Sequence, residues 1–331
     1  MSSPYRIFGV DLSPYSLKTR SYFRYKQIPH EWIVRNAGNL DEFTQYAKLP
    51  LVPLVVTPEG RGIQDSTPII EAMEALHPEP SIHPAGPVLG FLSALIEEYG
   101  DEWGNKAMFH YRWWDEPDQL SAAERIARSN LEGASEAEIG AARDAIRKRM
   151  VPRLSFVGSS EHTRDQIEKS YRQQLEILEA HLAERKYLFG ARPAFADFGL
   201  SAQLYQCSTD PTAGALLRES APKVLAWCDR MLAPKAEGPF ERWDSLAAGL
   251  EALLEREIAA LFLPWSAANA QALAAGDAEF TVELDGSPYT QKPQKYHAKS
   301  LAVLKNRYAA LDQREELDRI LEKTNCLAWL R

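Results

Sequence analysis

The chain has 331 residues, of which 45% are hydrophobic and 25% charged, so it is long enough for two domains that each have a core. Its formal net charge of −8 argues against nucleic acid or an anionic membrane as a partner. The first residues lack the basic start and long apolar run of a secretory signal, and no stretch approaches the apolar length that crosses a membrane. We therefore expect a cytoplasmic protein with no membrane span.

The cysteines and histidines give no sign of a metal site. Cys207, Cys228 and Cys326 are far apart and form no CxxC or metal-ligand spacing. The seven histidines are equally scattered, without an HxxxH or HExxH pair. We expect no bound metal, and thiols that are buried and reduced.

Residues 1–80 alternate between strand and helix patterns. The candidate strands are YRIFGV, HEWIVR, PLVVT and GRGIQ, and the last two are joined by a Pro58-Glu59-Gly60 turn that suits a hairpin. The candidate helices are LKTRSYFRYKQI, which Pro29 ends, DEFTQYAK, and TPIIEAMEAL with a proline in its first turn. The order β-α-β-α-β-β-α predicts an α/β domain.

A proline-rich linker and a long helical region follow. HPEPSIHPAGPV holds four prolines among twelve residues, a composition that suits neither helix nor strand. From there to about residue 275, apolar and aromatic residues recur at helical spacing, most clearly over residues 91–114. We divide the chain into an α/β domain (1–80), a linker (81–88), an all-helical domain (89–245) and a C-terminal extension (246–331).

The extension changes character after residue 275. Asp285-Gly286 stands between two alternating runs in EFTVELDGSPYTQ and predicts a hairpin, with helices such as EELDRILEK after it. An isolated hairpin is only marginally stable, and large apolar groups are too frequent here for a disordered tail; they are Trp265, Phe280, Val282, Leu284, Tyr289 and Tyr296. We expect residues 275–331 to be ordered and packed on the helical domain.

The first cluster that can carry chemistry is Ser13-Pro14-Tyr15-Ser16, between a strand and a helix. The N-terminus of a helix favours negative charge, and a hydroxyl placed there can donate a hydrogen bond to a bound thiolate and lower the pKa of that thiol. The plain alternative is that Ser13 or Ser16 only caps the helix.

Two further clusters flank the predicted hairpin. Val52-Pro53 precedes a strand; if this peptide bond is cis, the free N–H and C=O of Val52 can pair with an extended peptide ligand, whereas a trans proline would be an ordinary strand start. Asp65-Ser66 opens a helix, where a carboxylate and a hydroxyl can receive the ammonium and carboxylate of an amino acid, or can serve only as a helix cap.

Together these spacings resemble the cytosolic glutathione transferase family. Ser13-Pro14-Tyr15-Ser16 matches the active-site loop of that family, Val52-Pro53 falls where the family has its cis-proline, and Asp65-Ser66 followed by Ile69 matches the segment that grips the γ-glutamyl group. FGARPAFADFGLSAQL and APKVLAWCDRM resemble consecutive helices of the family's second domain. The resemblance covers residues 5–76 and roughly 88–233. It implies a thioredoxin-like α/β domain followed by an all-α domain, in a serine-type, bacterial-like member with an extended C-terminus.

Some residues depart from the family pattern. Ala194 stands where members usually have Ser or Thr, so the hydroxyl half of a helix capping box is missing, although Asp197 can still reach back to the N-cap N–H. Residues 116–165, which we expect to form one or two surface helices, and the tail after residue 245 exceed a typical member.

The resemblance also implies a ligand, a reaction and site residues. Glutathione is expected as co-substrate, with Ser13 as the catalytic hydroxyl, an electrophilic, hydrophobic small molecule as the second substrate, and a homodimer as the assembly. The expected glutathione contacts are Ser16, Lys48, Val52, Pro53, Asp65 and Ser66, and the electrophile pocket is placed at Tyr15, Trp103, His110 and Tyr111. Lys18, Arg20 and Arg35 are further cations near the expected anionic tripeptide, with solvated surface charges as the alternative.

The residues leave several activities open. Because both loop positions that carry cysteine in thiol transferases are serine here, the sequence favours conjugation or another transferase reaction over thiol–disulfide exchange. The alternatives are a glutathione-dependent peroxidase or reductase, a glutathione- or ligand-binding protein without turnover, and a scaffold whose tail is an interaction module.

Overall fold

The structure is a computed structural model that describes residues 4–331. Its first part is a four-stranded sheet in the order β2-β1-β3-β4, with β2 parallel to β1 and both β3 and β4 antiparallel to their neighbours. The elements are β1 (Tyr5–Gly9), α1 (Pro14–Tyr25), β2 (His30–Val34), η1 (Ala37–Asn39), α2 (Leu40–Tyr46), β3 (Leu54–Val56), β4 (Gly62–Gln64) and α3 (Ser66–Leu76). This is the predicted thioredoxin-like α/β order, which is confirmed.

The sheet is covered on both faces because apolar residues alternate along its strands. Ile7 and Val55 pack in the main core with Ile69 of α3. Phe8 and Leu54 point the other way and pack against Phe43 of α2. The central strands β1 and β3 are therefore buried on both faces, whereas β2 and β4 are partly exposed.

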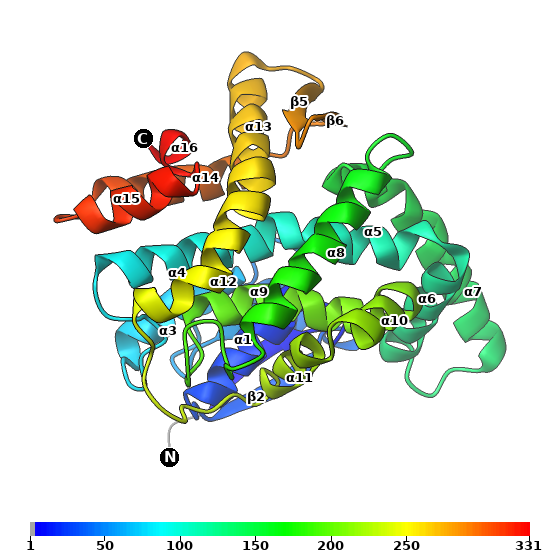
Figure 1. Ribbon diagram of the computed structural model, residues 1–331. Helices are drawn as coiled ribbons and strands as arrows, with labels where there is room; N and C mark the ends of the chain where they lie inside the picture. Colours follow the sequence, from blue (N-terminus) through cyan, green and yellow to red (C-terminus); the bar gives the residue numbers. More distant parts are fainter. Residues whose placement is uncertain (1–3) are drawn as a thin grey trace.

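The second part is helical, as predicted. It contains α4 (Pro87–Tyr99), the π-helical turn η2 (Gly100–Gly104), α5 (Asn105–Trp114), α6 (Glu116–Asn130), α7 (Glu136–Met150), η3 (Val151–Val157), α8 (Arg164–His181), α9 (Phe195–Ser208), α10 (Pro211–Ser220) and α11 (Pro222–Arg230). Helix α9 lies at the centre and contacts α1, α4, α5, α10 and α11 (Figure 1). A Cβ at Gly100 would lie 2.8 Å from the backbone of Leu200, so glycine permits the close crossing of the helical run at η2 with α9.

Half of the predicted capping box is present at the start of α9. The Oδ2 of Asp197 accepts a hydrogen bond of 2.8 Å from the N–H of Ala194. Its Oδ1 accepts from the N–H of Leu188 at 2.8 Å and from Nε1 of Trp227 at 2.9 Å. The carboxylate thus joins three segments, and the hydroxyl missing at Ala194 removes only one bond of this network.

The C-terminal extension adds a long helical run, a hairpin and three helices. These are α12 (Trp243–Leu253), the π-helical η4 (Leu254–Phe262), α13 (Leu263–Ala275), β5 (Phe280–Leu284), β6 (Ser287–Gln291), α14 (Lys295–Ala309), α15 (Glu315–Lys323) and α16 (Leu327–Leu330). Asp285 and Gly286 form the hairpin turn with φ of 50° and 75°, as the Asp-Gly pair predicted.

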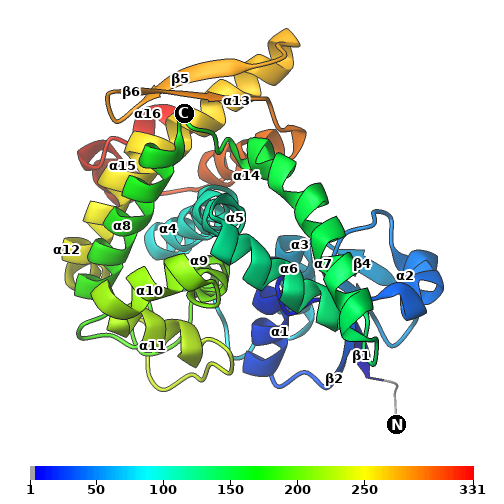
Figure 2. The same cartoon turned by 90° about the vertical axis from the view of Figure 1, so that its right-hand side faces the viewer.

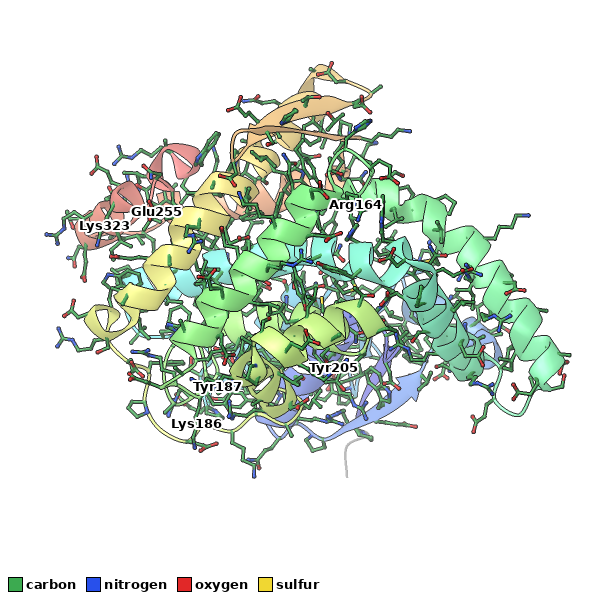
Figure 3. The ribbon with its side chains drawn as sticks, turned by 45° about the vertical axis from the view of Figure 1, so that its right-hand side comes forward. Arg164, Lys186, Tyr187, Tyr205, Glu255 and Lys323 are labelled. Atoms are coloured by element: carbon green, nitrogen blue, oxygen red, sulfur yellow. The ribbon has the colours of Figure 1, made fainter. Side chains whose placement is uncertain are left out.

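The extension lies against the helical part of the chain. Helix α12 contacts α8, and α14 and α15 contact α4 (Figures 1 and 2). Phe280, Leu284 and Tyr289 are buried in the main core, whereas Tyr296 is 54% exposed. Nζ of Lys323 on α15 is 2.7 Å from Oε2 of Glu251 on α12; Figure 3 labels Lys323 and also Glu255, which follows Glu251 by four residues on the same helical run.

Within residues 4–331, no helix is both long and apolar enough to pass through a bilayer. In the same residues, no group of three or more His, Cys, Asp or Glu side chains is placed to hold a metal ion.

Candidate functional site

Strand pairing brings the three predicted clusters to one edge of the sheet. Phe8 is the partner of Leu54 across β1 and β3, and Leu54 is the partner of Gln64 across β3 and β4. The loop after β1 therefore leaves the sheet beside the segment that enters β3 and the segment that follows β4. Ser13, Val52-Pro53 and Asp65-Ser66 stand in these three segments.

The loop after β1 separates the roles of its two serines. Ser13 is the N-cap of α1 and is partly exposed, and its Oγ accepts a hydrogen bond of 3.2 Å from the N–H of Ser16. Ser16 is fully buried, and its Oγ accepts from the N–H of Val10 at 3.3 Å. Both hydroxyls accept in these bonds, so the two serines differ in exposure: Ser13 can donate its proton to an acceptor outside the loop, whereas Ser16 is enclosed and holds the loop from within.

The Val52–Pro53 peptide bond is cis. Neither the N–H nor the C=O of Val52 forms a hydrogen bond with another residue of the described range 4–331. These two groups are free to pair with an extended ligand, which is the arrangement that a cis bond was expected to give.

Gln64 holds the loop before the cis-proline, and its role was not predicted. Its Nε2 donates to the carbonyl oxygens of Leu49 at 2.8 Å and of Leu51 at 2.9 Å. Its Oε1 accepts from the N–H of Lys48 at 2.6 Å and of Leu49 at 3.0 Å. An amide both donates and accepts, and its place at the end of a predicted hairpin strand is the signal that could have indicated this role.

Asp65 and Ser66 present polar groups at the N-terminus of α3. Asp65 has φ of 77° and makes no side-chain cap to its own helix; its Oδ2 accepts a hydrogen bond of 2.6 Å from the hydroxyl of Tyr296. Ser66 is 1% exposed, and its Oγ has no hydrogen-bond partner in the described part of the chain. A carboxylate, an unused hydroxyl and the N-terminal dipole of α3 therefore lie together.

A buried ion cluster lies behind this edge of the sheet. Nζ of Lys18 is 2.6 Å from Oδ2 of Asp101 and 2.8 Å from Oγ1 of Thr67, and it also contacts Oε1 of Glu97. Lys18 is fully buried, so it is neither the solvated charge nor the ligand contact considered from the sequence. The cluster joins α1 and α3 of the first domain to α4 and η2 of the second.

The pKa values in this cluster follow from burial and pairing. Burial raises the pKa of Glu97 and of Asp101 to about 7, although Lys18 acts in the opposite direction. Burial alone would lower the pKa of Lys18, but Asp101 and Glu97 outweigh it and raise that pKa overall. The lysine is thus fixed in its charged form.

Lys48 is exposed, and its ammonium forms no ion pair with any residue between 4 and 331. It stands at the start of the loop that Gln64 holds, so a role at the glycine end of glutathione stays a prediction. Tyr15 is partly buried, and its hydroxyl donates to the carbonyl oxygen of Asp101 at 3.0 Å.

The structure does not bring the other predicted pocket residues to this edge. Trp103, His110 and Tyr111 are all buried. Trp103 donates from Nε1 to Oγ of Ser170 at 2.9 Å, and Nδ1 of His110 is 2.8 Å from Oγ of Ser159.

Trp103 is covered by the extension. Its ring packs 5.7 Å from that of Trp265, and the cavity beside it has a volume of about 10 Å³, no more than one water needs. The geometry favours core packing for these residues, and an electrophile pocket at them stays a prediction without support.

The comparisons with known proteins agree with this geometry. The family model described as glutathione S-transferase, N-terminal domain, matches residues 12–76, and the model described as glutathione S-transferase, C-terminal domain, matches residues 161–230. No curated protein sequence matches the chain.

Several solved structures are similar at low identity. A glutathione S-transferase from Rhodospirillum rubrum F11 has 19% identity and a TM-score of 0.43, with 68% of this chain and 86% of that chain covered. Beta-etherase LigF from Sphingobium sp. strain SYK-6 has 18% identity and a TM-score of 0.49, with 75% of this chain and 99% of that chain covered. A glutathione S-transferase from Methylobacterium radiotolerans JCM 2831, in complex with glutathione sulfonate, has 17% identity and a TM-score of 0.42, covering 75% and 94%.

The two domain models match in their family order, the first on the α/β part of the chain and the second on the helical part. The chain belongs to the glutathione S-transferase superfamily.

Proposed function

We propose that the protein is a glutathione transferase-like enzyme that activates the thiol of glutathione for attack on an electrophilic, hydrophobic small molecule. The observation that carries the proposal is the set of uncommitted polar groups at one sheet edge. These are the Ser13 hydroxyl proton, the Val52 backbone groups and the buried Ser66 hydroxyl. Their chemistry is complementary to a peptide that has an amino-acid head and a thiol.

Each group then has a role. The Val52 N–H and C=O pair with the cysteinyl residue beside Pro53, Asp65 receives the γ-glutamyl ammonium, Ser66 donates to the γ-glutamyl carboxylate, and Lys48 attracts the glycine carboxylate. Ser16 acts within the loop, because its Oγ binds the N–H of Val10.

Ser13 acts on the sulfur. Its hydroxyl donates a hydrogen bond to the thiolate and so lowers the pKa of the glutathione thiol, whose proton passes to solvent. The sulfur electron pair then forms a carbon–sulfur bond with the electrophile, and the leaving group departs with its own electron pair. The hydrogen bond is retained while charge develops on sulfur, so it favours the reactive form.

The cysteines of the chain are poorly suited to thiol–disulfide exchange. Cys207, Cys228 and Cys326 are buried, and burial raises the pKa of Cys207 and Cys326 to about 12. Buried thiols with raised pKa are poor nucleophiles, and the site loop offers serine in their place. This supports a transferase over a reductase.

A second candidate, glutathione binding without turnover, is favoured by one observation. Trp103, His110 and Tyr111 are packed in the core, and the cavity beside Trp103 has only about 10 Å³. A conjugating enzyme needs room for the second substrate, so turnover must be measured separately from binding.

The test compares Ser13→Ala with Ser16→Ala. We expect wild type to bind glutathione in calorimetry and to conjugate a generic aryl halide. Ser13→Ala should reduce turnover by about tenfold or more, which corresponds to about 1.4 kcal/mol of transition-state stabilisation, with the glutathione Kd nearly unchanged. Binding without turnover in wild type would select the second candidate. Unchanged turnover in Ser13→Ala together with a loss in Ser16→Ala would transfer the role to Ser16.

We also propose a homodimer, which rests on family membership alone. Light scattering at micromolar concentration should give twice the 37.3 kDa of one chain, and a value equal to one chain would contradict the proposal.

A further inference from the structure

Tyr296 links the C-terminal extension to the candidate glutathione site. It stands in the first turn of α14, and its hydroxyl donates to Oδ2 of Asp65 at 2.6 Å. The side chain is 54% exposed, unlike the neighbouring aromatic residues Trp265 and Tyr289, which are fully buried. Burial of apolar surface therefore does not explain its position, whereas the hydrogen bond to Asp65 does.

The start of α14 is fixed in place. His297 contacts the carboxylate of Glu102, and Oγ of Ser300 donates to Oε2 of Glu98. Both acids are buried on the run formed by α4 and η2, which α14 contacts (Figures 1 and 2). Both contacts come directly after Tyr296 on the same helix, so they fix the start of α14 and place the Tyr296 side chain on an anchored helix.

Asp65 and Ser66 have capacity left beside Tyr296. An ionised carboxylate has about four acceptor positions, and Oδ1 of Asp65 has no hydrogen-bond partner in the part of the chain that the structure describes. Oγ of Ser66 is buried and also without a partner there. An ammonium can therefore bind Asp65 while Tyr296 keeps its own bond, and the phenol oxygen can accept a second hydrogen bond from that ammonium.

We propose that Tyr296 is a positioning residue of this site, which orients the Asp65 carboxylate toward the α-ammonium of an amino-acid head group. The inference rests on the proposed glutathione site and deepens it: the extension supplies one wall of the γ-glutamyl subsite. Without the Tyr296 hydroxyl, the Asp65 side chain loses the contact that fixes its rotamer. Each binding event then has to order this side chain, and the entropy lost weakens binding.

The experiment uses the full chain and the variant Tyr296→Phe, which keeps the ring and removes only the hydroxyl. We expect the Kd for glutathione to rise about fivefold or more, with KM raised and kcat at saturating glutathione unchanged. The second probe is glutaryl-cysteinyl-glycine, which is glutathione without its α-ammonium. Its Kd should be equal for wild type and variant, because Tyr296 acts through the Asp65–ammonium contact.

Tyr308→Phe is the matched control. Tyr308 lies on the same helix, and its hydroxyl donates to Oδ1 of Asp318 at 2.7 Å, so the variant loses the same kind of bond away from the site. It should leave both Kd values unchanged. The double variant Tyr296→Phe, Asp65→Asn should bind glutathione no more weakly than Asp65→Asn alone, because the two changes remove the same interaction between Asp65 and the ammonium.

Three results would overturn the inference. Tighter glutathione binding by Tyr296→Phe would mean that Tyr296 blocks the site. Equal weakening for glutathione and its deaminated analogue would mean that Tyr296 does not act through the ammonium. Failure of wild type itself to bind glutathione would reject the proposed function together with this inference, and that failure is seen before any variant is compared.

Discussion

Lys18 at the junction of the two domains and Lys106 on α5 are both buried lysines, with exposures of 0% and 2%. Lys18 meets the carboxylates of Glu97 and Asp101. Lys106 meets no carboxylate within the described residues: its Nζ lies 3.9 Å from the ring centroid of Trp265 and donates to Oε1 of Gln291 at 2.8 Å and to the carbonyl oxygen of Val157 at 3.0 Å. Burial accordingly lowers the pKa of Lys106, whereas that of Lys18 is raised.

Glu257 completes the contrast. It is fully buried on η4, and within the described residues its carboxylate forms hydrogen bonds only with neutral groups. Its carboxyl oxygens accept from Ser170 at 2.6 Å and from Tyr99 and Gln173 at 3.0 Å each. Burial raises its pKa to about 8, although these hydrogen bonds act in the opposite direction. The domain junction is thus held by buried paired charges, whereas the buried surroundings of Lys106 and Glu257 consist of apolar packing and hydrogen bonds to neutral groups.

Removal of the extension after Gly276 should break the second region and leave the first intact. The truncated chain loses the buried side chains of Phe280, Leu284 and Tyr289 and exposes the Lys106 surroundings. Each lost side chain contributes about 1.5–3 kcal/mol before ordering entropy, so we expect the melting temperature to fall by about 10 °C or more. A truncated protein that melts with the full chain would show that the extension does not stabilise the helical domain.

Lys18→Met should break the first region. The change leaves Glu97 and Asp101 buried without their cation, and loss of one partner of a buried ion pair costs about 3–5 kcal/mol. We expect a lower melting temperature at pH 8, and a smaller loss at pH 5, where carboxyls with a pKa of about 7 are protonated.

Lys148→Met is the control for this variant, because Lys148 is exposed on α7. It should change the melting temperature little at either pH. Equal losses for the two lysine variants would contradict a structural role for the Lys18 cluster.

Glu257→Gln tests the neutral character of the second region and has the smallest expected effect. The folded pKa of about 8 lies above the ordinary value of 4.5, so the protonated form stabilises the fold below pH 4.5, and this contribution is lost as the pH rises through 8. The melting temperature of the uncharged variant should therefore be a few degrees higher than that of wild type at pH 8.5 and equal to it at pH 5. The exposed neighbour Glu255 provides the control variant Glu255→Gln, and an unchanged pH dependence in Glu257→Gln would mean that Glu257 is ionised in the fold.

The order of the elements in the first domain could be predicted because the relevant signals are local. Alternating apolar residues mark the strands, Pro68 falls in the first turn of α3, and Asp285-Gly286 fixes the turn of the second hairpin. Helix α1 begins at Pro14, three residues before the predicted segment LKTRSYFRYKQI. The three site segments could likewise be located, since each stands at a strand end or a helix start.

The contacts between distant segments could not be predicted in this way. Tyr296 and Asp65 are 231 residues apart, and Lys18 and Asp101 are 83 apart. From the sequence alone, a lysine in an amphipathic helix is predicted to be an exposed surface charge, because the partner helix that buries it is not known. The burial of Trp103 and His110 also depends on which helix face the extension and α8 cover. Aromatic residues occur on every side of this helix, so their spacing does not indicate which side is buried.

The sequence by itself therefore determined the family, the strand and helix order of the first domain and the position of the site along the chain, because those depend on residues within a few positions of one another. Only the tertiary structure decided which serine of the loop faces outward, which charges are buried and that the extension reaches Asp65. These features follow from packing between helices that are far apart in the sequence. The free energy of that packing depends on the apolar area that is buried and on the polar groups that come into contact, and the local spacing of residues does not specify either.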